Sequence, residues 1–135
     1  MATVKEAIYA ILQTDAQISG SDHLGGLLGH RSQSPYGIYF MNPPEKPDFP
    51  LITYYEIAAS GRILRVEGFN FTVWCDDYEA IHELIYDLLH KQSLGTTTGV
   101  ENVVLEWNWA GPPIFDQNYN ILTKIHRYLQ YGVKM

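Results

Sequence analysis

The stretch FNFTVWCDDYEAIHELIYDLL, residues 69–89, decides the fold because its hydrophobic repeat changes in the middle. The first half alternates apolar and polar residues, as strands do, and places one set on a single face: Phe69, Phe71, Val73 and Cys75. The second half has apolar residues every three or four positions, which predicts an amphipathic helix with this face: Ala80, Ile81, Leu84, Ile85, Leu88 and Leu89. A strand that leads directly into a helix is typical of a mixed sheet-and-helix fold.

Two adjacent carboxylates, Asp76 and Asp77, stand at this strand–helix junction. Such a pair could serve as an acid and a base in catalysis. A carboxylate at a helix start also accepts hydrogen bonds from free backbone N–H groups and interacts favourably with the helix dipole. Glu79, three residues after Asp76, completes a capping-box pattern. We therefore interpret the pair as structural.

The remaining periodic segments complete the predicted architecture. Residues 3–6 form a capping box for a first helix that is expected to end near Thr14 or Asp15, with its apolar face at Val4, Ala7, Ile8, Ile11 and Leu12. Strands are predicted at 51–58 and 65–75, joined as an antiparallel hairpin by the turn 59–62, and again at 103–110 and 121–135. With a short strand at 37–41, the sequence predicts one α+β domain over residues 1–135. It has a mostly antiparallel sheet of about five strands and two helices packed on one face.

The segment 16–50 is rich in glycine and proline, interrupted by a predicted helical turn at 23–28 and the short strand at 37–41. A second Gly- and Thr-rich loop is expected at 93–99. Loops as long as 16–50 are uncommon within compact domains unless they bind something. This segment is therefore the first functional hint in the chain.

Composition narrows the class of protein. The chain of 135 residues has 15 acidic and 9 basic residues, for a formal net charge of -6, and its basic residues are dispersed. Binding to nucleic-acid phosphates needs a dense basic face, so this charge argues against a broad nucleic-acid footprint. The single cysteine, Cys75, cannot form an internal disulfide and fits a reducing compartment. We expect synthesis in the cytosol and no membrane span, since no apolar run approaches the roughly 20 residues required.

The sequence contains no recognisable catalytic or metal-binding motif. His23, His30, His82, His90 and His126 lack metal-ligand spacing, and each is expected to be solvated. The glycine-rich run 25–29 lacks the Lys-Ser/Thr ending of a phosphate loop. Cys75 is expected in the core. We therefore expect no catalytic, cofactor-binding or metal site, and a protein that is not an enzyme.

Aromatic residues stand out instead, with ten tyrosines and three tryptophans. Several are expected on strand faces opposite the helices, and the candidates are Tyr54, Trp74 and one of the pair Trp107 and Trp109. Tyrosine and tryptophan are enriched at protein interfaces, although the same rings could complete a second core. The candidate interface residues are these aromatics and two residues of the proline-rich loop: Asp48, Phe49, Tyr54, Trp74, Trp107 and Trp109.

The order of segments resembles the tail-completion, or tail-terminator, family of long-tailed phages and prophages, which joins heads to tails. The resemblance spans nearly the whole chain: ILQTDAQI, LGGLLGHR, GIYFMN, PPEKPDFPLITYYEI, the strand–helix stretch of 69–89, and a last strand with Arg127 and Tyr128. It implies a non-enzymatic subunit of a homo-oligomeric ring, commonly a hexamer, at the head-proximal end of the tail tube. The implied partners are the major tail tube protein and the head–tail connector proteins, and the implied location is the virion. DNA would pass through the lumen without specific binding.

Two alternatives follow from the same residues. One is a small ligand-binding or enzymatic α+β domain with residues 20–50 as a lid, which predicts a concave pocket with converging polar groups. The other is a single-stranded RNA binder on an aromatic sheet, which the acidic charge disfavours.

Overall fold

The computed structural model describes residues 4–16, 28, 37–60, 65–92, 94 and 103–131. Within these ranges the chain forms two helices and six strands, in this order: α1 (Val4–Ala16), β1 (Ile38–Phe40), β2 (Leu51–Ser60), β3 (Arg65–Trp74), α3 (Tyr78–Leu89), β4 (Val104–Ala110), β5 (Ile114–Asp116) and β6 (Ile121–Tyr131). The predicted mixed content of helices and strands is confirmed. The predicted count of about five strands is one too low, because β5 has only three residues and follows directly on Gly-Pro-Pro.

The six strands form one sheet in the order β1-β2-β3-β6-β4, and β5 pairs with β6. All pairs are antiparallel except β1 with β2, which run parallel. The predicted hairpin is present as β2 and β3, paired from Leu51 with Trp74 to Ser60 with Arg65. The last strand, β6, lies in the interior of the sheet, between β3 on one side and β4 and β5 on the other.

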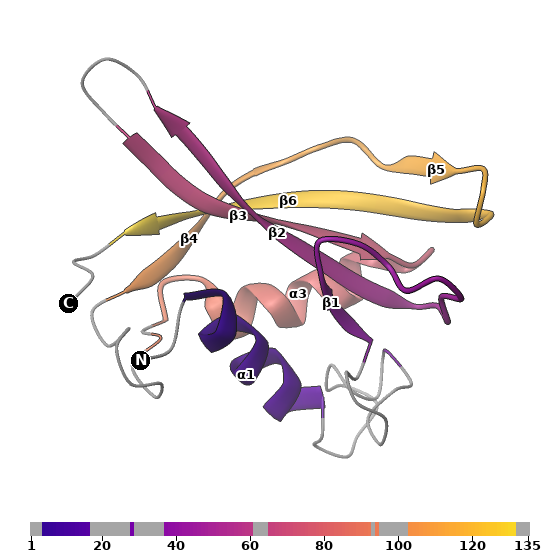
Figure 1. Cartoon of the computed structure of the whole chain (residues 1–135), viewed down its shortest axis with the longest axis horizontal. Coiled ribbons are helices and arrows are strands. Elements are labelled where there is room, and N and C mark those ends of the chain that lie inside the picture. The colour runs from indigo at the N-terminus through magenta and orange to yellow at the C-terminus, as the bar shows by residue number, and fades with distance from the viewer. Residues whose placement is uncertain are drawn as a thin grey trace.

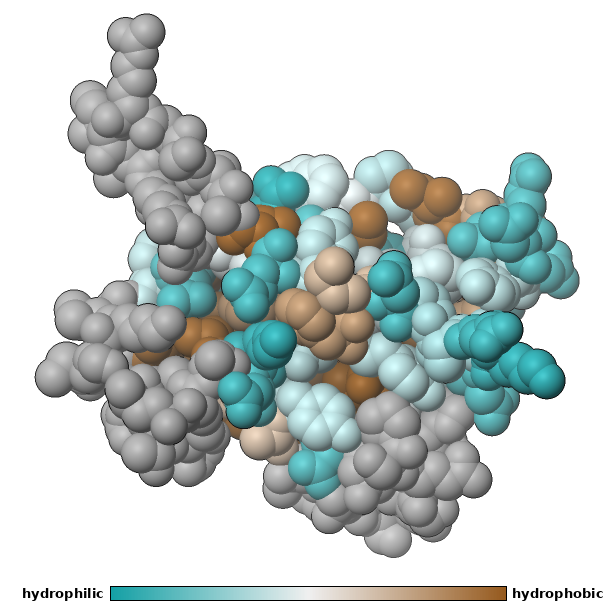
Figure 2. Space-filling view, viewed as in Figure 1, coloured by the Kyte–Doolittle hydropathy of each residue, from teal (hydrophilic) through white to brown (hydrophobic). Residues whose placement is uncertain are grey.

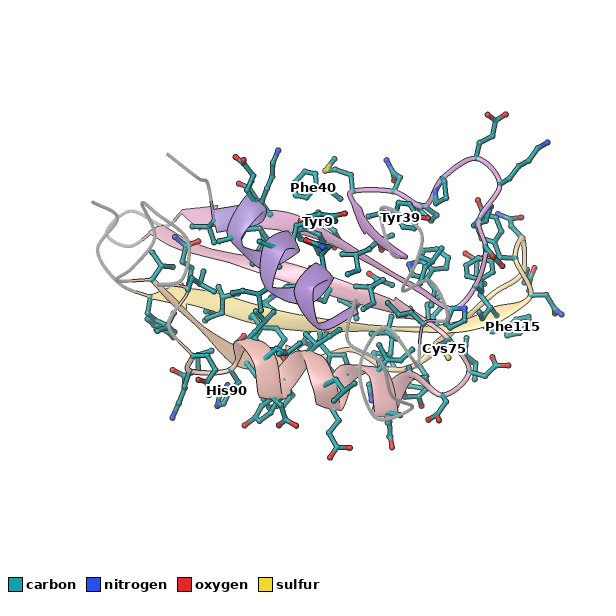
Figure 3. All side chains as sticks on the ribbon, turned by 90° about the horizontal axis from the view of Figure 1, so that it is seen from below. Tyr9, Tyr39, Phe40, Cys75, His90 and Phe115 are labelled. Carbon is teal, nitrogen blue, oxygen red and sulfur yellow. The ribbon has the colours of Figure 1, made fainter. Side chains whose placement is uncertain are left out.

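Both helices lie below the sheet in the view of Figure 1. Seen from below, α3 runs along the direction of the strands and α1 is inclined to it (Figure 3). We call the sheet face that carries Phe69, Phe71 and Val73 the covered face, because these side chains share one buried cluster with those of α1 and α3. The opposite face, which carries Asn70, Thr72 and Trp74, is called the open face. The alternation predicted for residues 69–75 is thus correct.

The core lies between the covered face and the two helices. From α1 it takes Val4, Ala7, Ile8 and Leu12; from α3 Ile81, Ile85 and Leu89; and from the sheet mainly Ile52, Tyr54, Phe69, Phe71, Val73, Leu105 and Tyr128. The rings are in contact: Tyr54 stacks on Phe71 at 5.6 Å, and Phe71 meets Tyr128 edge-on at 5.3 Å. Burial of this much apolar surface is the main stabilising contribution to a domain of this size.

The open face is stabilised by its own side chains. Asn70 donates a hydrogen bond to the Tyr55 hydroxyl (2.9 Å) and accepts one from Nε of Arg127 (3.2 Å). The guanidinium of Arg127 in turn lies 5.3 Å from the centroid of the Trp109 ring. Polar side chains are therefore buried on this face without a helix above them, Thr53, Asn70, Thr72 and Thr123 among them.

One end of the molecule is polar. In Figure 2, hydrophilic side chains gather at the right-hand end, where Figure 1 places the segment between β1 and β2 and the turn between β5 and β6. The exposed side chains of Glu45, Lys46 and Asp48 belong to this segment.

Several predictions lie wholly or partly outside the described residues: the capping box at Thr3, the helical turn 23–28 apart from Leu28, residues 61 and 62 of the predicted turn 59–62, most of the loop 93–99, and the strand beyond Tyr131. The first two residues of that predicted turn, Ala59 and Ser60, belong to β2, so this part of the prediction is wrong. The first helix ends at Ala16, one or two residues after the predicted end.

Candidate functional site: a groove between α3 and the sheet

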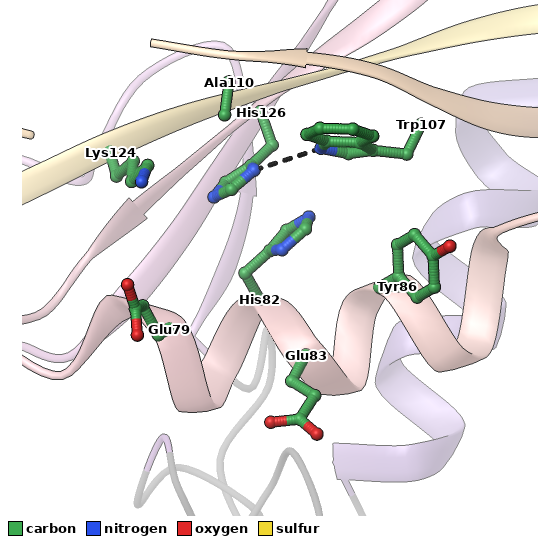
Figure 4. A pocket seen from close by; sticks show the side chains of 8 residues that line it. All are labelled: Glu79, His82, Glu83, Tyr86, Trp107, Ala110, Lys124 and His126. Atoms are coloured by element: carbon green, nitrogen blue, oxygen red, sulfur yellow. Dashed lines mark hydrogen bonds between the residues drawn. The ribbon is translucent and has the colours of Figure 1, made fainter. Parts of the chain in front are cut away.

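A groove of about 440 Å³ lies where α3 passes β4 and β6 (Figure 4). It is lined by Glu79, His82, Glu83 and Tyr86 of α3, Trp107 and Ala110 of β4, and Lys124 and His126 of β6. The four helix residues recur at three- and four-residue spacing, so they form one row along α3. Lys124 and His126 are two residues apart on a strand and therefore share a face.

A β-bulge brings only one of the two neighbouring tryptophans to this groove. Trp107 pairs with Tyr128, but Trp109 pairs with Arg127, so Asn108 is an extra residue in β4. Partners in an antiparallel pair share a face. Trp107 therefore lies on the covered face with Tyr128, whereas Trp109 lies on the open face with Arg127. The prediction that one of the pair is opposite the helices holds for Trp109.

Two stacked histidines form the centre of the groove. The rings of His82 and His126 lie 3.3 Å apart between centroids and are inclined by only 6°. Nε1–H of Trp107 donates to Nδ1 of His126 (3.3 Å), and the Tyr128 hydroxyl lies 2.8 Å from Nε2 of His82. Each imidazole is thus contacted by an aromatic side chain of the sheet, so the fold fixes the position of both rings.

Both histidines are neutral at pH 7. Burial lowers the pKa of His82 from 6.5 to about 3, with smaller contributions from His126 and Lys124. Burial also lowers the pKa of His126 to about 4, and Lys124 adds to the effect. The cause is that a charged imidazole loses hydration in the groove and is repelled by a nearby ammonium group.

The third histidine near the groove has a different function in the fold. His90 stacks on Tyr86 at 4.2 Å, and its Nδ1 accepts the backbone N–H of Trp107 (3.0 Å). Residues 90 and 105 form an isolated parallel bridge, and Lys91 N–H donates to the Leu105 carbonyl (2.7 Å). The end of α3 therefore covers the outer edge of β4 at these positions.

The expectation of solvated histidines is wrong for His82 and His126. His126 is 7% exposed, and His82 is partly buried. The two residues are far apart in sequence, so spacing alone gives no sign of the pair. Alternation in the last strand does place His126 on the face of Tyr128, which is the one sequence signal that could have revealed its burial.

The predicted interface residues do not gather in one place. Tyr54 is 2% exposed, and its hydroxyl donates to the Lys5 carbonyl of α1 (3.0 Å), so its predicted position opposite the helices is wrong. In β2 the prediction put the alternating side chains on the wrong faces. Tyr54 pairs with Phe71 and therefore shares the covered face with it. Burial raises the pKa of the Tyr54 hydroxyl, which stays protonated.

Trp74 lies on the open face, as predicted, and joins the loop to the sheet. Its indole N–H donates to Thr53 Oγ1 (2.9 Å), and its ring stacks on Phe49 at 6.1 Å. Tyr119 meets both rings edge-on, at 5.8 Å from Trp74 and 5.4 Å from Phe49. The neighbouring Asp48 is exposed. These rings form a small cluster at the polar end of the molecule.

The Asp76/Asp77 junction has a structural contact, but not the predicted one. Asp77 precedes the first residue of α3 without a side-chain capping hydrogen bond, so the capping-box expectation is wrong. Asp76 Oδ1 instead accepts the backbone N–H of Leu122 (3.2 Å) and ties the junction to β6. The adjacent Cys75 packs against the core as predicted, and burial raises the pKa of its thiol.

Among the residues that the structure describes, no group of three His, Cys, Asp or Glu side chains is arranged to hold a metal ion. In the same part of the chain, neither helix has the length and apolar character needed to cross a membrane. Comparison of the sequence with models of known protein families finds no match, and a search of curated proteins finds no similar one.

Proposed function

We propose that this protein is a non-enzymatic structural subunit of a long-tailed phage or prophage. In this proposal it forms a homo-oligomeric ring, a hexamer, at the head-proximal end of the tail tube. There it ends polymerisation of the major tail tube protein and joins the tail to the head connector. Its place is the virion, after synthesis in the bacterial cytoplasm. The proposal rests on the resemblance of the sequence to the tail-completion family.

The observation that supports it best is a run of exposed apolar side chains along β4, β5 and the turn that follows. Trp107, Trp109, Ile114, Phe115 and Tyr119 are between 39% and 54% exposed in the single chain. They lie at one border of the sheet, with Trp107 on the covered face and Trp109 on the open face. Exposed apolar side chains gathered on neighbouring strands are typical of a site of protein contact. Among the described strands β4 and β5 pair with β6 alone, which leaves β5 and the part of β4 beyond the end of α3 at the border of the sheet, where a neighbouring subunit can reach them.

A ring requires a heterologous interface that closes, in which one patch of a subunit meets a different patch of the next. The exposed run supplies one patch. Phe115, which belongs to this run, lies at the opposite end of the molecule from His90 (Figure 3). The net charge of -6 favours a lumen that does not retain DNA.

The decisive experiment is deletion of the gene from an inducible phage or prophage that carries it. We expect filled heads without tails and free tails, some abnormally long, in negative-stain micrographs, and joined particles when the protein is restored. Normal infectious virions from the deletion strain would overturn the proposal.

A matched pair of variants tests the surface itself. Phe115→Ser should fold normally, judged by its thermal midpoint, but should not restore joined particles. Met41→Ser changes a side chain of similar exposure, 55% against 50%, away from β4 and β5, and should restore them. Full restoration by Phe115→Ser would exclude this surface from the interface.

The groove favours a second candidate function, a small-molecule-binding domain. Its volume of about 440 Å³ is in the ordinary range for such sites. The eight described lining residues come from α3, β4 and β6, so none of residues 37–50 is among them.

A further inference from the structure

The groove has an aromatic end and a charged end. Figure 4 shows Tyr86 and Trp107 on one side of the stacked histidines and Lys124 on the other. The fold fixes both rings of the aromatic end: Tyr86 stacks on His90 at 4.2 Å, and the indole N–H of Trp107 donates to His126. The two side chains are 37% and 39% exposed, so each also presents ring surface to a partner. The aromatic end is therefore a preformed site for an apolar group.

The hydrogen bonds of the stacked histidines favour a group without polar atoms. Nδ1 of His126 already accepts the indole N–H of Trp107, and Nε2 of His82 is in contact with the Tyr128 hydroxyl at 2.8 Å. A tyrosine or tryptophan that entered the groove would bring a further O–H or N–H donor that needs an acceptor. A phenyl ring brings none, and aromatic rings pack well against one another.

The chain carries a matching side chain far from the groove's aromatic end. Phe115 of β5 is 50% exposed and is the one phenylalanine among the exposed large apolar side chains of the described residues. It lies at the opposite end of the molecule from His90, which stacks behind Tyr86 (Figure 3). A single copy therefore cannot place Phe115 between its own Tyr86 and Trp107, whereas a second copy can.

The groove has room for this ring. An engineered apolar cavity of about 150 Å³ holds one benzene molecule. The groove, of about 440 Å³, exceeds that volume. Ring size therefore sets no obstacle to the entry of Phe115.

From this geometry we propose that the phenyl ring of Phe115 from one copy enters the groove of a second copy, between Tyr86 and Trp107. The inference rests on the proposed function, because it names the two patches that join neighbouring subunits of the ring. A projecting side chain and a pocket at opposite ends of one chain make a heterologous contact, which is the kind that closes into rings. Aromatic anchors seated in preformed pockets dominate the binding energy of many protein interfaces.

The test is photo-cross-linking of the purified full chain. One copy carries p-benzoylphenylalanine, a photoreactive analogue of phenylalanine, at position 115, and the other is 15N-labelled and otherwise wild type. They are mixed at about 1 mM, so that even a contact with a millimolar Kd is populated, and irradiated. Mass spectrometry then identifies the linked peptides, and the label marks links between copies. We expect these links at the labelled peptides that contain Tyr86 or Trp107.

Three variants of the labelled copy show whether the contact is heterologous. Tyr86→Ser removes one wall of the groove and should lower the yield of links about fivefold or more. Phe115→Ser leaves the groove intact and should give the wild-type yield, because the labelled copy supplies only the groove. Met41→Ser, at a side chain 55% exposed and outside the lining of the groove, is the control and should also give the wild-type yield.

The contact is overturned if links between copies are absent, if they map to another surface, or if Phe115→Ser lowers the yield as much as Tyr86→Ser. The first two results come from the wild-type labelled copy, so they decide the matter even if a variant fails to fold. The deletion strain decides the proposed function separately. Free tails in that strain with links outside the groove would overturn only this contact, and normal virions with links at Tyr86 or Trp107 would overturn only the proposed function.

Discussion

The two faces of the sheet differ in what stabilises them, and neighbouring residues of β3 illustrate the difference. Phe71 points into the core, where Tyr54 and Tyr128 contact its ring under two helices. Thr72, on the open face, is 8% exposed although neither α1 nor α3 lies on that face. The covered face is stabilised by apolar burial, and the open face by hydrogen bonds and ring contacts among its own side chains. A sheet can therefore be shielded from water on both faces with helices on only one.

The largest effect is expected from removing a ring on the covered face. Phe71→Ala should lower the free energy of unfolding by about 3–5 kcal/mol, because it leaves a cavity between Tyr54 and Tyr128. Thr72→Val, the control on the open face, keeps the volume and should cost less than about 1 kcal/mol. Both values come from urea denaturation at pH 7. Equal losses in the two variants would mean that the faces do not differ in this way.

The histidine pair gives the covered face a dependence on pH. The pKa values of His82 and His126 are about 3 and about 4 in the folded chain and near 6.5 when unfolded, so the unfolded chain binds more protons as the pH falls. Stability is complete above pH 6.5 and is lost progressively towards pH 3–4. Between pH 7 and 4.5 we expect a loss of about 2.5 kcal/mol from each histidine.

The control for this effect is His126→Phe, compared at the same two pH values. The other titratable groups are present in both proteins, and burial raises the pKa of the Tyr128 hydroxyl, which stays protonated over this range. The difference between the two proteins in the free energy of unfolding lost between pH 7 and 4.5 therefore measures the contribution of His126. If the variant loses as much stability as the wild type, His126 is not protonated on unfolding in this range.

Sequence reasoning was most successful where one face of an element is uniformly apolar. The switch from strand to helix in 69–89 is correct, and Ile81, Ile85 and Leu89 of the predicted helix face are buried. It failed where the decisive contact joins distant segments. Tyr54 could be assigned to either face, because β2 carries apolar residues on both: Leu51 and Ile52 are equally buried.

The sequence did not predict the groove either, because its contacts also join distant segments. Its histidines come from α3 and β6, and no local pattern relates the two elements. The bulge at Asn108 is also invisible to alternation, which places Trp107 and Trp109 on one face although the structure separates them. Side-chain networks on the open face, such as Asn70 with Tyr55 and Arg127, depend on the register of three strands and cannot be derived from one segment.

The third effect concerns that network on the open face. Asn70→Ala leaves the Tyr55 hydroxyl and Arg127 Nε without their partner, and it should cost about 1–2 kcal/mol in urea denaturation. Asn70→Asp keeps the oxygen that Arg127 contacts and should lose less. A cost near zero for the alanine variant would show that these hydrogen bonds do not hold the open face together.

The smallest effect is expected at the junction between the faces, where β3 ends and α3 begins. Asp76 and Asp77 are both exposed, and Asp76 reaches beyond the junction, where its Oδ1 accepts the backbone N–H of Leu122. Asp76→Asn keeps an oxygen acceptor and should change the free energy of unfolding by less than about 0.5 kcal/mol, whereas Asp76→Ala should cost about 0.5–1 kcal/mol. The double variant Asp76→Asn/Asp77→Asn should fold and should still restore joined particles in the deletion strain. A folded double variant that restores none would show that the carboxylates themselves are required, and the junction would then be a functional site in addition to a turn of the chain.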